Sequence, residues 1–211
     1  MTENLELRMY GLVPYNISPI QQGIQFGHAV VEYGQKINLL RTGFYGRVML
    51  KLKSQLDEKY DQISQYDDWA DNWKTFIILN GGTSNHSVNR YSDNKEFFGT
   101  MENNLKSLED NGVEVGTFYE PDLNDMLSGI VFIVDERVFN KKDYPDFSDW
   151  LMDNYGELIR TELGTTVHTI AENIKNSTNK QDQKAYKEWV KLIGGDKNVF
   201  LRDFLKNFRL A

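Results

Sequence analysis

The chain of 211 residues contains no cysteine. This absence excludes disulfide bonds, thiolate zinc sites and cysteine nucleophiles. Long apolar runs are also missing, because no window approaches the roughly eighteen consecutive apolar residues that predict a transmembrane helix. The first six residues are acidic and carry no apolar run, so we expect no signal peptide and no membrane partner. A reducing cytoplasm is the expected compartment.

Positive charge is scarce in the first two thirds of the sequence. The formal net charge is −7, and residues 1–140 hold 12 basic against 20 acidic residues. Residues 184–211 hold seven basic and three acidic residues. An acidic protein repels phosphates, which disfavours tRNA as a partner, and a polyanion would meet the basic C-terminal segment first. A solvated helical face explains the same basic residues without a partner.

The hydrophobic share of 40% is large enough to build a core. Apolar runs predict strands over residues 5–13, 75–79, 113–119 and 130–134. Apolar spacing and capping signals predict helices over residues 18–36, 39–66 and 93–110, and mostly helices beyond residue 135. This order predicts an α/β fold, with a mixed four-stranded sheet flanked by helices. We expect an α/β domain over residues 1–140 and a helical extension packed on it over residues 141–211.

The first predicted helix carries one polar stripe. Its members follow at i, i+4, i+7 and i+11 and therefore share one side of the helix: Gln21, Gln25, His28 and Glu32. The other positions are mostly apolar, so we expect the helix to be largely buried. A buried amide without a partner costs about 1–3 kcal/mol. A pocket wall and an internal hydrogen-bond network both supply partners, and the pattern does not choose between them.

Polar residues also follow two of the predicted strands. The loop after residue 119 reads Glu-Pro-Asp-Leu-Asn-Asp over 120–125, and Asn80 opens the turn-rich loop after the strand at 75–79. Carboxylates suit Mg²⁺, but the loop lacks the spacing of an EF-hand, and a solvated acidic turn is favoured. We therefore predict no metal and no cofactor. His86 and His168 stand alone in polar contexts and are expected at the surface.

Two segments resemble the type II peptidyl-tRNA hydrolase superfamily. The strand at 7–13 and the helix after Ser18 are similar to the opening of that family, where the helix carries A-Q-x-x-H-A. Here Gln25-Phe26-Gly27-His28-Ala29 occupies that place. The segment 118–124 resembles the family's acidic loop, in the E-P-D-L form of uncharacterised relatives. The resemblance covers roughly residues 5–138 and implies a type II peptidyl-tRNA hydrolase-like fold.

The sequence departs from this family at the residues that carry its chemistry. The enzymes place a catalytic lysine in the turn before the helix, where this chain has Ser18-Pro19-Ile20-Gln21. The loop aspartate of the enzymes is replaced by Glu120. Ester hydrolysis needs an activated water and stabilisation of a developing oxyanion. Glu120 could orient a water and Gln25 could donate a hydrogen bond, but neither replaces the missing cation.

Two function classes follow, and the sequence does not decide whether the chain is an enzyme. The first, which the missing lysine favours, is a protein that binds a nucleotide-like or other small polar ligand. Its ligand-binding residues would be Gln21, Gln25, Asn80, Asp122 and Asn124. The alternative is a divergent peptidyl-tRNA hydrolase or related esterase that uses Gln25, with His28 and Glu120 as catalytic residues. The composition also resembles tailed-phage accessory proteins that sequester host signals, which would place the chain in the host cytoplasm.

The last 28 residues predict two helices separated by Gly194-Gly195. Three phenylalanines recur every four residues on one face of the final helix: Phe200, Phe204 and Phe208. Three basic residues fall on the other face: Arg202, Lys206 and Arg209. We expect the aromatic face to dock on the protein itself with the basic face outward. An exposed aromatic face would instead favour a homodimer.

Overall fold

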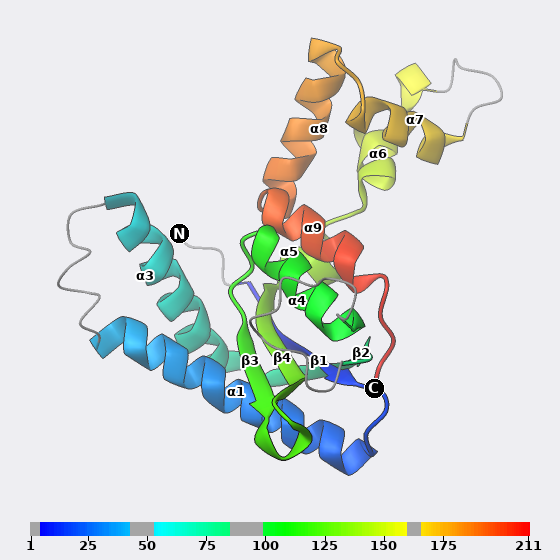
Figure 1. The fold of residues 1–211 in the computed structure, drawn as a ribbon. Helices are drawn as coiled ribbons and strands as arrows, with labels where there is room; N and C mark the ends of the chain where they lie inside the picture. Colours follow the sequence, from blue (N-terminus) through cyan, green and yellow to red (C-terminus); the bar gives the residue numbers. More distant parts are fainter. Residues whose placement is uncertain (1–4, 43–52, 85–98, 160–165) are drawn as a thin grey trace. The chain divides into compact units, whose positions relative to one another are not determined.

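The structure, a computed structural model, describes residues 5–42, 53–84, 99–159 and 166–211. The chain divides into two compact units (Figure 1). The sheet unit comprises Met1–Asp135 and Lys206–Ala211, and the helical unit comprises Glu136–Leu205. The helical unit is therefore an insertion between the main part of the sheet unit and the last six residues. This return of the C-terminal residues to the sheet unit was not predicted from the sequence.

The sheet unit is built on a mixed four-stranded sheet with the order β2-β1-β4-β3. Its strands are β1 (Leu7–Pro14), β2 (Thr75–Gly82), β3 (Gly116–Glu120) and β4 (Met126–Asp135). β1 runs parallel to β2 and antiparallel to β4, which is also antiparallel to β3. The predicted α/β class and four-stranded mixed sheet are confirmed.

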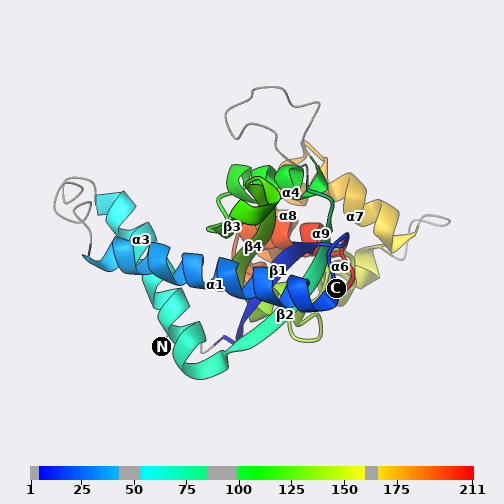
Figure 2. The same cartoon turned by 60° about the horizontal axis from the view of Figure 1, so that its bottom comes forward.

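Helices cover both faces of this sheet (Figure 2). α1 (Pro19–Thr42) lies across one face, where its Phe26 and Tyr33 share a core with Met9 and Val131 of the sheet. α4 (Thr100–Asp110) lies on the other face. Both central strands are buried on both sides, which explains their nearly continuous apolar sequences.

α1 begins with a capping box. The Ser18 hydroxyl accepts a hydrogen bond from the Gln21 backbone N–H at 3.3 Å, and the Gln21 side-chain oxygen accepts one from the Ser18 backbone N–H at 3.1 Å. Pro19 occupies the first helical position, where its missing N–H costs no hydrogen bond. These contacts explain why the helix starts at the predicted residue. It continues to Thr42, six residues beyond the predicted end.

The expectation that α1 would be largely buried was wrong. Gln25, Phe26, Ala29, Tyr33 and Ile37 are buried. On the opposite side, apolar side chains are exposed, with exposed fractions of 78% for Ile20, 49% for Ile24 and 58% for Val31. The sheet covers one face of α1, and α3 (Lys53–Asp68) lies beside the helix, with its Tyr66 ring 5.7 Å from the Tyr33 ring and its Asp67 paired with Arg41.

Two glycines of the sheet let α1 approach closely. A Cβ atom at Gly129 would lie 2.7 Å from the backbone oxygen of Gln25 and 2.9 Å from the Ala29 Cβ atom. A Cβ atom at Gly116 would lie 2.5 Å from the Tyr33 Cβ atom. Glycine at these positions therefore sets the height of α1 above β3 and β4. The same contacts seat Gln25 directly over the sheet.

Aromatic rings fill the space where α1 and α3 meet the sheet. Tyr66 lies 5.8 Å from Trp69, which opens the π-helical turn Trp69–Trp73 and donates its indole N–H to the Thr75 carbonyl. Trp69 in turn meets Phe76 of β2 at 5.3 Å between centroids. Burial raises the pKa of Tyr33 above its usual range. The hydroxyl of this side chain therefore stays protonated at neutral pH.

The last three residues form part of the sheet unit. The Asn80 backbone N–H donates to the Arg209 carbonyl at 2.9 Å, and the Ala211 N–H donates to the Ile78 carbonyl at 3.0 Å. Leu210 bridges Leu79 in antiparallel orientation. These bonds satisfy backbone groups of β2 on the side that faces away from β1, where an edge strand otherwise presents unpaired groups.

The helical unit contains α5 (Glu136–Phe139), α6 (Phe147–Ile159), α7 (Val167–Lys175), α8 (Lys180–Ile193) and α9 (Asp196–Leu205). Its core consists of Phe147, Leu151, Ala171, Trp189 and Ile193. The predicted break between the last two helices is confirmed, because Gly194 ends α8 in the left-handed conformation with φ 93°. None of the described helices is long and apolar enough to cross a membrane.

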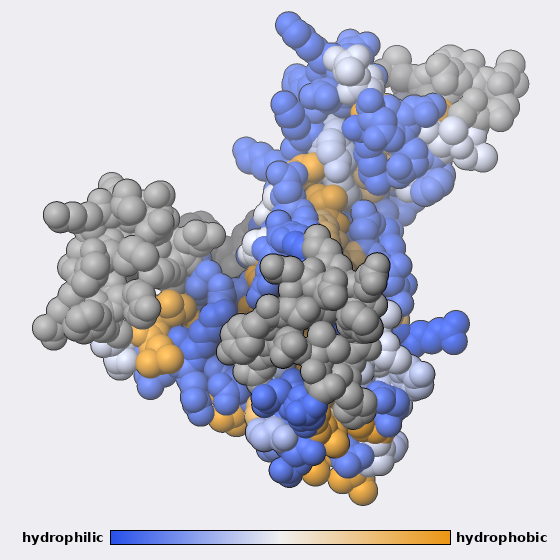
Figure 3. All heavy atoms as spheres, viewed as in Figure 1, coloured by the Kyte–Doolittle hydropathy of each residue, from blue (hydrophilic) through white to orange (hydrophobic). Residues whose placement is uncertain are grey.

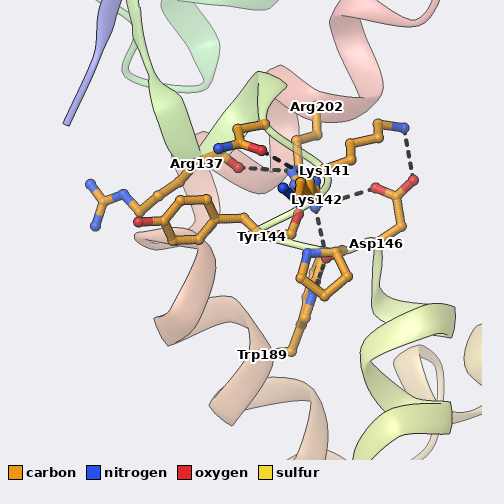
Figure 4. A network of polar contacts seen from close by, with 9 residues as sticks. Arg137, Lys141, Lys142, Tyr144, Asp146, Trp189 and Arg202 are labelled. Carbon is orange, nitrogen blue, oxygen red and sulfur yellow. Dashed lines mark hydrogen bonds and ion pairs between the residues drawn. The ribbon is translucent and has the colours of Figure 1, made fainter.

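Arg202 does not point outward as expected. Its side chain is 2% exposed and donates to the carbonyls of Arg137, Pro145 and Tyr144, with Asp146 beside it (Figure 4). Burial lowers the pKa of its guanidinium, which nonetheless stays charged at neutral pH. The carbonyls and the Asp146 carboxylate compensate the buried charge. Arg202 thus links the segment before α6 to α9 by hydrogen bonds.

The aromatic spacing of the final helix is partly confirmed. The Phe200 and Phe204 rings lie 5.3 Å apart, as expected for residues four apart on one helix face. Phe204 is buried and Phe200 is half-buried. Phe208 lies beyond the end of α9 at Leu205, so the predicted stripe of three rings on one helix does not form.

Candidate functional site

The candidate site lies at the end of the sheet where β1 and β3 finish. β1 and β3 are both antiparallel to β4, so they run in the same direction and finish at the same end of the sheet. The turn that opens α1 follows β1, and the acidic loop follows β3. Both loops therefore leave the sheet at the same end. Strand ends of this kind are where α/β sheets usually hold their ligands.

The sequence of the acidic loop explains its conformation. Glu120 caps the 3₁₀ turn Pro121–Leu123, because one of its carboxylate oxygens accepts the Asp122 backbone N–H at 3.4 Å. Pro121 is suited to the first position of this turn. Asn124 and Asp125 follow in the left-handed region, each with φ 57°. Asn and Asp tolerate this region best among residues with a Cβ atom, so the turn holds Glu120 in a defined direction.

Three side chains from different elements meet at this end of the sheet. The Gln25 side-chain nitrogen donates to the second carboxylate oxygen of Glu120 at 2.5 Å. The Gln25 side-chain oxygen accepts from the hydroxyl of Ser128, on β4, at 2.7 Å. The same hydroxyl lies 3.3 Å from the Phe118 carbonyl. We call Gln25, Glu120 and Ser128 the amide–carboxylate cluster.

The amide–carboxylate cluster holds the Glu120 carboxylate in place with hydrogen bonds but supplies no positive charge to it. Gln25 is 7% exposed and Ser128 is fully buried, so both ends of the amide are held by hydrogen bonds inside the protein. Glu120 is half-buried. Within the described part of the chain, no lysine or arginine forms an ion pair with it. A carboxylate has about four acceptor positions, so Glu120 can accept further donors.

His28 lies beside this cluster. It follows Gln25 by three residues and so occupies the next turn of α1 on the same side. Its ring is exposed and packs against the Phe118 ring, with 4.4 Å between centroids. Phe118 belongs to β3 and precedes Glu120 by two residues. The exposed imidazole face and the Glu120 carboxylate therefore come from adjacent positions on two packed elements.

Other predicted site residues lie apart from the cluster or have another role. Gln21 is exposed, and its side chain caps α1. Asp122 and Asn124 are exposed on the acidic loop. Glu32 is exposed on α1, two turns beyond Gln25.

Asn80 lies on β2, with β1 and β4 between it and β3, which corresponds to about 14 Å across the sheet. Its side chain accepts the Gly82 backbone N–H at 2.9 Å. His86 falls outside the described residues, and His168 is exposed on α7 as expected. In the described ranges, no three His, Asp or Glu side chains gather closely enough to hold a metal ion.

Two residues of the site, Ser128 and Phe118, were not predicted from the sequence. A signal for Ser128 was present, because it is a hydroxyl residue inside the apolar strand Met126–Asp135 and must find a hydrogen-bond partner there. Phe118 carried no such signal, since an aromatic residue in a strand is usual in any sheet. Its contact with His28 depends on the tertiary packing of α1 against β3.

No protein-family model, no curated protein and no solved structure matches this chain. The resemblance of residues 5–138 to the type II peptidyl-tRNA hydrolases therefore stays a prediction. What the chain does has to be inferred from its own geometry at the amide–carboxylate cluster.

Proposed function

We propose that the sheet unit binds a small polar, nucleotide-like ligand at the amide–carboxylate cluster, on a fold of the type II peptidyl-tRNA hydrolase kind, with little or no ester hydrolysis. One observation carries this proposal. The Glu120 carboxylate is held in place by Gln25 and by its own turn, yet it forms no ion pair with a described residue. A fixed carboxylate of this kind accepts N–H or O–H donors from a ligand.

The neighbouring groups favour a base or nucleoside over a free phosphate. Amino and imino groups of nucleobases donate to carboxylates, as exocyclic amines do to Glu and Asp in base recognition. The exposed face of His28, backed by Phe118, offers a flat surface on which a base can stack. Asp122 and Asp125 add negative charge to the loop and repel phosphate groups. The ligand would therefore bind through its base, with its phosphates directed away.

The missing cation argues against hydrolysis. The turn before α1 contains no lysine, and Gln21, which stands in that region, is engaged in the capping box. Loss of one group that stabilises a developing oxyanion typically lowers a hydrolytic rate by about 10²–10³. A binding protein without turnover would retain its ligand, which is the behaviour needed to sequester a nucleotide-like signal.

A thermal-shift screen against nucleosides and nucleotides tests the proposal. A ligand present at about 100 times its dissociation constant stabilises the native state by about 2.7 kcal/mol, which should raise the melting temperature by roughly 5–10 °C. We expect Glu120→Gln to abolish the shift, because the ligand's donors lose their charged acceptor. Asp122→Asn is the matched control, since it removes the same charge from an exposed position of the same loop.

Equal loss of the shift in both variants would contradict the proposal, because the loop would then act only through its charge. A hydrolase would be indicated by release of tRNA from peptidyl-tRNA by the wild-type protein, at a rate that Glu120→Gln abolishes. That outcome would favour the divergent esterase that uses Gln25, His28 and Glu120.

A further inference from the structure

Four lysines form a line along α8 of the helical unit. Lys180, Lys184, Lys187 and Lys191 follow one another at intervals of four, three and four residues. At about 100° per residue, this spacing places them within about 60° of one another around the helix axis, over a length of about 16 Å. All four side chains are exposed. We call these four residues the lysine stripe.

The packing of α8 explains why the lysine stripe faces solvent. Ala185, Trp189 and Ile193, on the opposite side of the helix, are buried in the helical unit. The two aromatic residues of α8, Tyr186 and Trp189, both pack against Phe147. Figure 3 shows a mostly hydrophilic surface over α8. The exposed side of the helix thus presents ammonium groups without aromatic rings.

The spacing of these lysines is unfavourable for the isolated helix. Lysines three or four residues apart repel one another, and Lys180 in the first turn opposes the helix dipole, whereas Asp182 in the first turn and Lys191 in the last turn favour it. Glu188 approaches Lys184 at 3.9 Å, but no other described residue forms an ion pair with the lysine stripe. The chain has 31 acidic residues, so acidic partners are abundant elsewhere in it. A line of like charge in which only Lys184 has an ion-pair partner among the described residues indicates a partner of opposite charge.

We propose that the lysine stripe is a docking surface for the phosphate backbone of a double-stranded nucleic acid. A line of ammonium groups about 16 Å long can contact several successive phosphates, and such contacts supply affinity without reading sequence. Proteins that bind single strands add aromatic side chains on which bases stack, and the lysine stripe has none. A membrane-surface helix inserts its apolar side into lipid, but the apolar side of α8 is buried in the helical unit.

The test uses the full-length protein and short labelled DNA and RNA duplexes, with binding followed by fluorescence anisotropy. For four phosphate contacts the logarithm of the affinity falls with the logarithm of salt concentration at a slope of about −3.6, or about a hundredfold between roughly 50 and 200 mM salt. We expect K180Q/K184Q/K187Q/K191Q to weaken binding at low salt at least about tenfold and to flatten this slope. The variant with arginine at all four positions should keep both.

The matched control is K36Q/K74Q/K106Q/K142Q, which removes the same number of charges from exposed lysines elsewhere in the chain. It should bind as the wild type does, and circular dichroism should show all variants folded. Equal weakening by both quadruple variants would overturn the proposal, as would absence of duplex binding at low salt. Tighter binding to the single strand, or binding only to anionic lipid vesicles, would overturn it as well.

Discussion

Ser128 determines which way the Gln25 amide points. Its fully buried hydroxyl donates to the amide oxygen, so the amide nitrogen is directed at Glu120. We expect Ser128→Ala to leave that oxygen without its donor and to lower the free energy of unfolding by about 1–3 kcal/mol. Thermal denaturation should show a melting temperature lower by several degrees, at about 2–4 °C per kcal/mol for a chain of this size.

The same truncation at Ser107 is the control for this prediction. Ser107 is half-buried on α4, and no described residue bonds to its hydroxyl. Ser107→Ala should leave the melting temperature nearly unchanged. If Ser128→Ala behaved like Ser107→Ala, the hydrogen bond between Ser128 and Gln25 would contribute nothing to stability.

Arg202 is the second residue whose role depends on burial. We expect Arg202→Met to destabilise the helical unit by at least about 2 kcal/mol, because the hydrogen bonds of the buried guanidinium to the Arg137 and Tyr144 carbonyls are lost. Chemical denaturation followed by circular dichroism measures the change. Arg209→Met, at an exposed position, should have little effect. An Arg202→Met protein as stable as the wild type would show that the guanidinium network is dispensable.

The sequence predicted site residues better where a local pattern was present. The helical stripe and the acidic loop singled out Gln25 and Glu120, which the resemblance placed at one site, and the two side chains meet at 2.5 Å. Gln21 was predicted as a ligand-binding residue, but its side chain is engaged in the capping box with Ser18. Arg202 could not be predicted. Its helical spacing suggested a solvated face, and its carbonyl partners are more than 55 residues away in the chain.

At the scale of elements, the C-terminal segment protects the edge of β2. Deletion of residues 209–211 should leave the backbone groups of Ile78 and Asn80 without their partners. We expect a lower melting temperature and more self-association, because an open strand edge pairs readily with another chain. Light scattering and thermal denaturation measure the two effects. Arg209→Ala, which keeps the backbone bonds, should cause neither.

Strands and helices were predictable in different degrees. Apolar runs located all four strands within a few residues, since both central strands are buried on both faces. The exposure of Ile20 and Ile24 was not predictable, because the composition of α1 does not indicate how many elements cover it. The pairing of Leu210 with Leu79 was also hidden, since three residues are too few to form a recognisable strand pattern.

At the scale of the whole molecule, the acidic and the basic surface belong to different units. The amide–carboxylate cluster lies in the sheet unit beside an acidic loop, whereas the lysine stripe belongs to the helical unit. The net charge of −7 is a sum over the whole chain and therefore does not reveal the lysine stripe. The regional imbalance was visible in the sequence, but only the packing of α8 shows that the four lysines share one exposed side.

The return of the last six residues to the sheet has a consequence for biosynthesis. The ribosome synthesises β2 before the helical unit, and the segment that pairs with β2 after it. At roughly 5–20 residues per second, about 6–25 seconds pass between completion of Gly82 and synthesis of Lys206. The edge of β2 therefore stays open in the nascent chain during this interval. Helices of the inserted unit can form meanwhile, so the sheet unit begins to fold first and is completed last.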